Sequence, residues 1–250
     1  MVEPFYQSIV LIAKGAFAGL GLKVDVVGEE NIPLSGGVLL AINHTSYMDF
    51  ALGGIPAHNR GRRLVRFMAK DSIFKHKIAG PLMRGMKHIP VDRDAGSQAF
   101  RDAVADLKKG EIVGVFPEAT MSRSLDIKDL KSGTIRMARI AKVPVLPMII
   151  FGGHRVLSYG VKDLTRGRPV VIMVGESLDI SGDPEEANDR LREALRDLLA
   201  KAIERYPDKP AGASWIPARF GGGAPTLQEA EVIEVEAHAE RAAKREARGE

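Results

Sequence analysis

Apolar positions follow two different patterns along this chain. Short runs rich in apolar residues predict strands at residues 23–27, 38–42, 65–69, 88–91, 113–116, 145–151 and 170–175, of which those at 38–42 and 145–151 read as buried. Between them, apolar side chains at helical spacing predict helices near residues 47–54, 72–77, 97–109, 132–141 and 183–206. Strands that alternate with helices are typical of the α/β class. We therefore expect a single α/β domain over residues 23–206, with a mixed, largely parallel sheet flanked by helices.

Both ends of the chain differ from this central part. Residues 5–22 form an apolar stretch at helical spacing, which contains a lysine and three glycines and is short for a membrane span. We interpret residues 1–22 as an N-terminal helix at a membrane interface; the alternative is a helix packed on the domain's own core. Residues 207–250 form a C-terminal extension that is partly flexible at 221–225 and is expected to end as a solvated helix or as disordered chain.

The composition of the 250 residues narrows the class of protein. A hydrophobic content of 45% with 27% charged residues is typical of a folded domain. The absence of cysteine excludes a disulfide framework, a thiol nucleophile and a cysteine-ligated metal. The sequence contains no glycine-rich loop of the dinucleotide-binding or P-loop kind. The first residues also lack the cationic start and small-residue cleavage site of a signal peptide.

Positive charge is concentrated in one segment. Residues 60–93 contain ten Lys or Arg but only Asp71 and Asp92 as acidic residues, although the formal net charge of the whole chain is +4. Such a segment can bind anionic lipid head groups, and it can equally bind nucleic acid. Because the apolar N-terminal helix offers a second anchor, we expect an anionic membrane surface as the partner, and no nucleic acid.

A histidine and an aspartate follow the second predicted strand. His44 is suited to accept a proton near neutral pH, and the Asp49 carboxylate could orient its ring. On one ideal helix, residues five apart point about 140° from each other, so the two meet only if His44 lies in a loop and Asp49 in the first helical turn. Ser46 is a suitable N-cap for that turn. The alternatives are a capping box and an ordinary loop histidine.

A second polar cluster follows the strand at residues 113–116. In open α/β sheets, ligands bind beyond the carboxyl ends of the strands. This is where the sequence has five polar side chains, which are Glu118, Thr120, Ser122, Arg123 and Ser124. Arg93 follows the strand at 88–91 in the same way, and Lys131 precedes the helix at 132–141.

Taken in order, these segments resemble the four motifs of the glycerophospholipid acyltransferase family, whose best-known members are lysophosphatidic acid acyltransferases. The motifs are Asn-His-x4-Asp, a strand ending in Asp-Arg, Phe-Pro-Glu-Gly-Thr-Arg-Ser, and a Val-Pro-x-x-Pro strand. The resemblance covers roughly residues 24–178. This chain departs from it at Ala119, where the family has glycine, and at Met121, where the family usually has an arginine that helps to bind the substrate phosphate.

The resemblance implies an O-acyltransferase that moves a fatty acyl chain from acyl-CoA or acyl-carrier protein to the hydroxyl of a lysophospholipid, in the first place lysophosphatidic acid. His44 would act as general base and Asp49 would orient it, without an acyl-enzyme. A nucleophilic Ser46 is the alternative. The predicted substrate-binding residues are Glu118, Thr120 and Ser122 for the acceptor, with Arg93, Arg123 and Lys131 for its phosphate. No cofactor is expected, and no metal, because no His or Asp pair has helix-face ligand spacing.

We expect such an enzyme on the cytoplasmic face of the cell membrane, as a peripheral or monotopic protein. The resemblance leaves other acceptors open, namely glycerol 3-phosphate, another lysophospholipid or a glycolipid. A protein of a different class, which binds anionic lipid on the same scaffold without catalysis, is the second hypothesis. The sequence does not indicate an oligomeric state.

Overall fold

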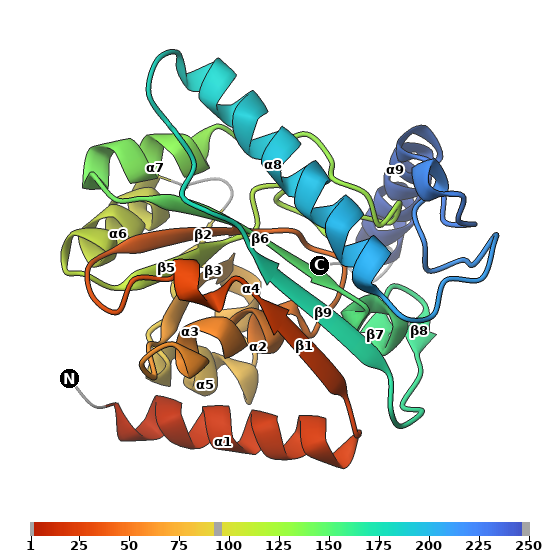
Figure 1. Cartoon of the computed structure of the whole chain (residues 1–250), viewed down its shortest axis with the longest axis horizontal. Coiled ribbons are helices and arrows are strands. Elements are labelled where there is room, and N and C mark those ends of the chain that lie inside the picture. The colour runs from red at the N-terminus through yellow and green to blue at the C-terminus, as the bar shows by residue number, and fades with distance from the viewer. Residues whose placement is uncertain (1–2, 93–96, 247–250) are drawn as a thin grey trace.

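The computed structural model describes residues 3–92 and 97–246 of the chain, and its centre is a seven-stranded sheet (Figure 1). Its strand order is β1-β9-β6-β2-β5-β3-β4. Only β6 and β9 pair antiparallel within this sheet, so the prediction of a mixed, largely parallel sheet is confirmed. Its strands are β1 (Lys23–Val27), β2 (Val38–Ile42), β3 (Val65–Lys70), β4 (Ile89–Val91), β5 (Ile112–Val115), β6 (Val145–Phe151) and β9 (Pro169–Val174).

Helices cover both faces of the sheet and give the domain three layers. Figure 1 shows α6, α7 and α8 on one face, and α1, α2 and α3 on the other. The helices are α1 (Pro4–Gly19), α2 (Asp49–Gly53), α3 (Ile55–Asn59), α4 (Asp71–Phe74), α5 (Ala79–Gly85), α6 (Ser97–Lys108), α7 (Gly133–Ala141), α8 (Pro184–Arg205) and α9 (Leu227–Glu246).

The central strand β2 explains why the apolar runs are continuous. All five of its residues are buried. Leu39 and Ala41 pack into the core beneath α6, α7 and α8, whereas Leu40 and Ile42 pack into the core on the opposite face. A parallel strand covered on both faces needs apolar side chains at every position. Each fully buried leucine or isoleucine contributes about 1.5–3 kcal/mol of transfer free energy.

The short helices differ most from the sequence prediction. The helix expected at 47–54 begins only at Asp49, and Gly54 and Pro56 start the separate helix α3, which was not predicted. The helix expected at 72–77 is the four-residue α4, and α5 was not predicted. A two-stranded hairpin of β7 (Leu157–Ser158) and β8 (Val161–Lys162) was also missed. Helices of one turn carry too few apolar positions to show a periodicity.

Helix α1 packs on the domain and also presents apolar side chains to solvent. Tyr6 is buried, and its hydroxyl donates a hydrogen bond to the carbonyl of Val65 at 2.8 Å. The ring of Phe5 lies against Gly85, where an added Cβ would be 2.4 Å from it. On the outer face, however, Leu11 and Ile12 are 66% and 67% exposed. The helix therefore packs on the domain through one face, while its other face presents apolar side chains to solvent. The membrane-interface role of residues 1–22 stays a prediction.

Part of the basic segment at 60–93 is structural. The Arg63 guanidinium donates hydrogen bonds to the carbonyls of Pro33 and Gly110 at 2.7 and 2.8 Å. Arg66 is buried and forms an ion pair with Glu3. A guanidinium engaged with backbone carbonyls or a carboxylate is not available to a lipid head group. Arg63 and Arg66 therefore have partners within the protein, and the contact of the basic segment with an anionic membrane surface stays a prediction.

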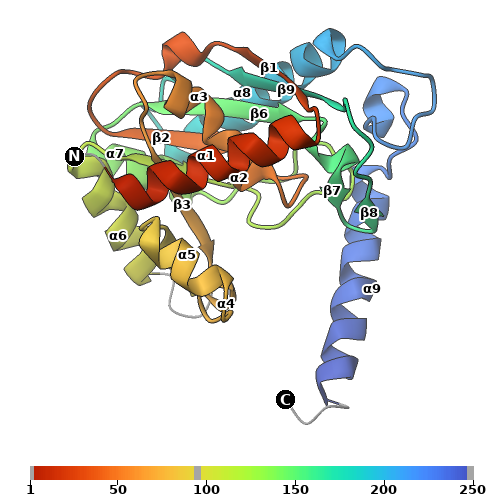
Figure 2. The same cartoon turned by 90° about the horizontal axis from the view of Figure 1, so that it is seen from below.

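The C-terminal extension makes contacts within itself and with the rest of the domain. Thr226 and Glu229 form a reciprocal capping box at the start of α9, with hydrogen bonds of 2.8 and 3.2 Å. Before it, the Trp215 ring lies 3.9 Å from the Arg155 guanidinium carbon. Figure 2 shows α9 projecting away from the body of the domain. Of the two expected states of this end, the helix is the one observed.

One buried histidine makes stability depend on pH. His88 accepts a hydrogen bond from the backbone N–H of Phe67 through Nδ1 at 3.1 Å, and burial lowers its pKa from 6.5 to about 4. The unfolded chain takes up a proton below pH 6.5 that the folded protein does not bind, so this stability is complete above pH 6.5 and is lost as the pH falls towards 4.

The variant His88→Asn tests this, because its side-chain oxygen can replace Nδ1 as acceptor without titrating. Between pH 6.5 and 4, the free energy of unfolding of the wild type should fall by about 3 kcal/mol more than that of the variant. Urea unfolding at several pH values measures the difference. The same pH dependence in both proteins would contradict a neutral buried ring.

Candidate active site

The candidate site begins where β2 ends. Asn43 continues the strand ladder with its side chain, which donates to the carbonyl of Ile150 at 3.2 Å and accepts from the Ile150 N–H at 2.7 Å. These two hydrogen bonds to the neighbouring strand fix the point at which the chain leaves the sheet. The next residue, His44, therefore starts from a defined position at the carboxyl edge.

His44 and Asp49 meet across the loop and the first turn of α2. The Nδ1 atom of His44 lies 2.9 Å from Oδ2 of Asp49. The same oxygen accepts hydrogen bonds from the backbone N–H groups of Thr45 and Ser46, both at 2.8 Å. Asp49 is fully buried, and burial raises its pKa. Because the carboxylate can only accept, Nδ1 carries the proton and Nε2 presents a lone pair.

Two phenylalanines hold the imidazole ring. Phe116 stacks on it with ring centres 4.2 Å apart and planes inclined by 25°, and Phe50 contacts it edge-on at 6.1 Å. The His44 side chain is 15% exposed. A ring packed on one face and bonded at Nδ1 has a fixed orientation, so its Nε2 atom can act as a base at the mouth of the site.

Glu118 braces this arrangement from the next loop. Its Oε1 accepts from the backbone N–H of His44 at 3.0 Å, and its Oε2 accepts from the backbone N–H of Lys128 at 3.1 Å. The side chain is buried, and burial raises its pKa to about 7. Both carboxylate oxygens accept from backbone donors, so Glu118 positions the loop of His44. Its contact with the acceptor stays a prediction.

Two further predicted residues lie in the β5–α7 loop, which comprises residues 116–132. The hydroxyl of Ser122 is buried, donates to the Asp126 carbonyl at 2.8 Å and lies 2.9 Å from Ser124 Oγ. Its predicted contact with the acceptor stays a prediction. The backbone N–H of Ser122 donates to the His44 carbonyl at 2.7 Å, so it joins the two loops. Thr120 is half-buried, and its hydroxyl lies 2.5 Å from the Lys128 ammonium nitrogen.

The three cations predicted for phosphate have different surroundings. The Arg123 guanidinium carbon lies 4.1 Å from the ring centre of Tyr159, in the turn between β7 and β8. Lys131 is exposed, and its backbone N–H donates to the Pro117 carbonyl at 2.9 Å. Arg93 lies outside the described residues.

The two departures from the family motif have structural consequences. Ala119 adopts the left-handed region with a φ of 63°, a conformation that costs an L-residue about 1–2 kcal/mol and that glycine adopts freely. Met121 is only 4% exposed. The position at which the family usually has its arginine therefore carries an apolar, buried side chain.

Two further buried histidines have partners of their own. His88 is engaged with the backbone of Phe67, and His154 lies with Nε2 at 3.0 Å from the carbonyl of Trp215. Within residues 3–92 and 97–246, no group of three His, Asp or Glu side chains could hold a metal ion. That the chemistry needs no metal stays a prediction.

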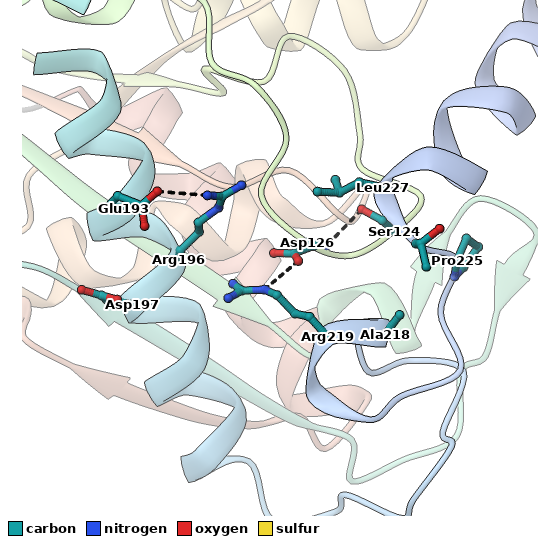
Figure 3. A pocket seen from close by; sticks show the side chains of 10 residues that line it. Ser124, Asp126, Glu193, Arg196, Asp197, Ala218, Arg219, Pro225 and Leu227 are labelled. Carbon is teal, nitrogen blue, oxygen red and sulfur yellow. Dashed lines mark hydrogen bonds and ion pairs between the residues drawn. The ribbon is translucent and has the colours of Figure 1, made fainter. Parts of the chain in front are cut away.

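A polar cavity of about 680 Å³ lies between the β5–α7 loop, α8 and the C-terminal extension (Figure 3). Its charges are largely compensated, since Arg219 lies 2.6 Å from Asp126 and Arg196 lies 3.0 Å from Glu193. His44 does not line it. We therefore do not assign the reaction to this cavity.

A smaller, apolar cavity of about 140 Å³ lies between α1, α2 and α5. Its lining includes Phe17 from α1, Met83 from α5, and Phe50 from α2. Phe50 is the residue whose ring contacts His44 edge-on. The apolar cavity and the imidazole therefore contact the same aromatic side chain.

Sequence analysis missed several residues that shape this site. Phe50 and Phe116 directly follow Asp49 and the β5 strand, so their positions beside the motifs were a usable signal. Tyr159 and Lys128 carried no such signal, because their contacts with Arg123 and Thr120 depend on how the loops fold.

Comparison with known proteins finds similar sequences and a similar fold. A family model described as Acyltransferase matches residues 23–151. The "1-acyl-sn-glycerol-3-phosphate acyltransferase" of Bacillus subtilis (strain 168) is 30% identical over 190 residues, which cover 74% of this chain and 89% of that protein. The protein of the same name from Borreliella burgdorferi is 26% identical over 196 residues, covering 74% of this chain and 73% of the relative. The crystal structure of the 1-acyl-sn-glycerophosphate (LPA) acyltransferase from Thermotoga maritima superposes with a TM-score of 0.67 at 26% identity, covering 81% of each chain.

The fold is thus shared with a protein named as an acyltransferase. The chain belongs to the acyltransferase family. It is an O-acyltransferase. Among the helices in the described part of the chain, none is both long and apolar enough to cross a membrane.

Proposed function

We propose that this enzyme transfers a fatty acyl chain from the thioester of acyl-CoA or acyl-carrier protein to the free hydroxyl of lysophosphatidic acid. The observation that carries the proposal is the His44–Asp49 pair, with Nε2 of His44 left to face an acceptor at the carboxyl edge of β2. The names of the relatives support this acceptor, because they are 1-acyl-sn-glycerol-3-phosphate acyltransferases.

The reaction follows from this geometry. Nε2 of His44 removes the proton of the acceptor hydroxyl as its oxygen attacks the thioester carbonyl. The imidazolium that forms is stabilised by the Asp49 carboxylate, 2.9 Å from Nδ1. The tetrahedral intermediate then expels the thiolate, which takes the proton from Nε2, so that an ester and a free thiol are the products. No cofactor takes part in this scheme.

Direct transfer is favoured over an acyl-enzyme. The Ser46 hydroxyl donates to the carbonyl of Leu157 at 2.7 Å and accepts from the N–H of Met48 at 3.0 Å. Its side chain is fully buried. A nucleophilic serine needs its hydroxyl bonded to the base, and here it is engaged with backbone groups instead.

The apolar cavity behind Phe50 is our candidate for the acyl chain. It adjoins the residue that contacts His44, and its lining is mostly apolar. An acyl chain gains about 0.8 kcal/mol for each buried CH₂ group, so such a lining favours a long chain over water.

We further propose that the enzyme binds the cytoplasmic face of the membrane peripherally through the outer face of α1. Leu11 and Ile12 support this, because they are exposed and apolar. Replacing both with serine should reduce binding to vesicles containing anionic lipid by about tenfold or more in sedimentation assays, since the lost apolar area contributes roughly 25 cal/mol per Å². Their exposure predicts an unchanged melting temperature, and unchanged vesicle binding would refute this docking face.

An acceptor screen tests the proposed function. Purified protein is given acyl-CoA with lysophosphatidic acid, glycerol 3-phosphate, another lysophospholipid or a glycolipid, and thiol release is followed while products are identified by mass spectrometry. With lysophosphatidic acid as the acceptor, we expect thiol release and phosphatidic acid as the product. Vesicle binding without turnover of any acceptor would instead support a non-catalytic lipid-binding protein.

A further inference from the structure

An acceptor that carries a phosphate needs a cation close to the base. In lysophosphatidic acid, only a C–C–O linkage separates the free hydroxyl from the phosphorus, so a cation that binds the phosphate must lie close to His44. Met121 supplies no charge, and its side chain is buried. Arg123 is stacked on Tyr159.

Lys128 is a cation of the β5–α7 loop that lies beside the predicted acceptor residues. Its ammonium nitrogen is 2.5 Å from the Thr120 hydroxyl and 3.5 Å from Oε2 of Glu234 in α9. The side chain is 19% exposed, so it is held within the structure and still reaches solvent. An ammonium group has three hydrogen-bond donors, and a carboxylate at 3.5 Å leaves donors for a phosphate oxygen.

Lys128 is also tied to the base. The Glu118 carboxyl group accepts from the backbone N–H of His44 with one oxygen and from the backbone N–H of Lys128 with the other. One buried carboxyl group therefore fixes the backbone of the proposed base and that of this cation relative to each other. Because both bonds use backbone donors, replacing the Lys128 side chain leaves them in place.

From these contacts, we propose that Lys128, assisted by the Thr120 hydroxyl, binds the phosphate of the acceptor. Glu234 of α9 holds the ammonium group in the absence of acceptor and competes with the phosphate for it. This inference rests on the proposed function, because it assumes a phosphate-bearing acceptor. It gives the C-terminal extension an influence on acceptor affinity that the sequence did not suggest.

The test uses the full-length protein with lysophosphatidic acid varied at saturating acyl-CoA. The variant Lys128→Met should raise the KM for lysophosphatidic acid about tenfold or more, as expected for a lost charged hydrogen bond, with little change in kcat. Lys128→Arg should restore part of the affinity. Removing the competing carboxylate in Glu234→Gln should lower the same KM. As a matched control, Lys201→Met removes an exposed lysine on α8 and should leave the KM unchanged.

Lys128→Met and Glu234→Gln are expected to change the KM in opposite directions, which separates phosphate binding from a structural role. If Lys128 and Glu234 only form an ion pair that supports the loop, both variants should raise the KM or lower the melting temperature together, and the inference would be wrong. An unchanged KM in Lys128→Met would also overturn it.

A wild type that does not use lysophosphatidic acid would reject the proposed function instead. In that case, thermal stabilisation by glycerol 3-phosphate tests the cation directly. Stabilisation that is lost in Lys128→Met and kept in Lys201→Met supports the inference, and equal stabilisation of both variants overturns it.

Discussion

Replacing His44 with alanine should lower the rate of acyl transfer by about 10²- to 10⁴-fold, the usual contribution of a general base. The loss is expected because Nε2 of His44 is the nitrogen left free when Nδ1 is bonded to Asp49. The backbone bonds that join this loop to Glu118 and Ser122 do not involve the ring, so the fold should be retained. Thiol release from acyl-CoA in the presence of lysophosphatidic acid measures the effect.

The control for this variant is a circular dichroism spectrum and a melting temperature close to those of the wild type. A folded His44→Ala protein with wild-type kcat would exclude the general-base role. A loss of activity that accompanies unfolding would say nothing of the base, so the two measurements are made on the same preparation.

Asp49→Asn should lower kcat about 10²-fold or more while the protein remains folded. The amide oxygen can still accept from the N–H groups of Thr45 and Ser46, which lie 2.8 Å from the carboxylate oxygen in the wild type. The amide has no negative charge, however, and it no longer stabilises the imidazolium that forms during the reaction. Because His44 and Asp49 act as a unit, the double variant should be no slower than His44→Ala alone.

Kinetics of the two single variants and the double variant provide the measurement. If the effects of the single variants multiply in the double variant, Asp49 acts independently of His44. If Asp49→Asn retains the wild-type kcat, the carboxylate has only the structural role of closing the turn before α2.

The central strands were predictable from the sequence because they are nearly continuous apolar runs. Residues 38–42 and 145–151 are buried along their whole length, and the predicted bounds coincide with β2 and β6. The strand order was not predictable, since it depends on pairings between distant segments. For example, β9 runs antiparallel to β6 and parallel to β1.

The His44–Asp49 pair was predictable because its two residues are close in sequence and a loop followed by a helical turn is the geometry that joins them. The structural role of Glu118 was not predictable, because a carboxylate that follows a strand can equally be a ligand-binding group or a group that holds the backbone of a loop. The distances to backbone nitrogens 74 and 10 residues away show that Glu118 joins two loops. Lys128 was overlooked because its contacts with Thr120 and Glu234 depend on how the chain folds.

Charge and apolar character along the chain were less reliable guides to surfaces. Arg66 belongs to the basic segment but is buried against Glu3, because a guanidinium can satisfy backbone carbonyls and a carboxylate inside a fold. Helix α1 is apolar on two sides, so its sequence was compatible with both a core helix and an interfacial helix. The structure shows which side of the helix contacts the domain, through Tyr6 and Phe5.

The most direct measurement of the central claim is a rapid-mixing experiment with acyl-CoA and stoichiometric enzyme, in which lysophosphatidic acid is added second. Direct transfer by His44 predicts no thiol release before the acceptor arrives, and then one phosphatidic acid for each thiol released. Intact-protein mass spectrometry should show no acyl adduct at any time. A stoichiometric burst of thiol before the acceptor, together with an acylated protein, would contradict the account and point to a covalent intermediate.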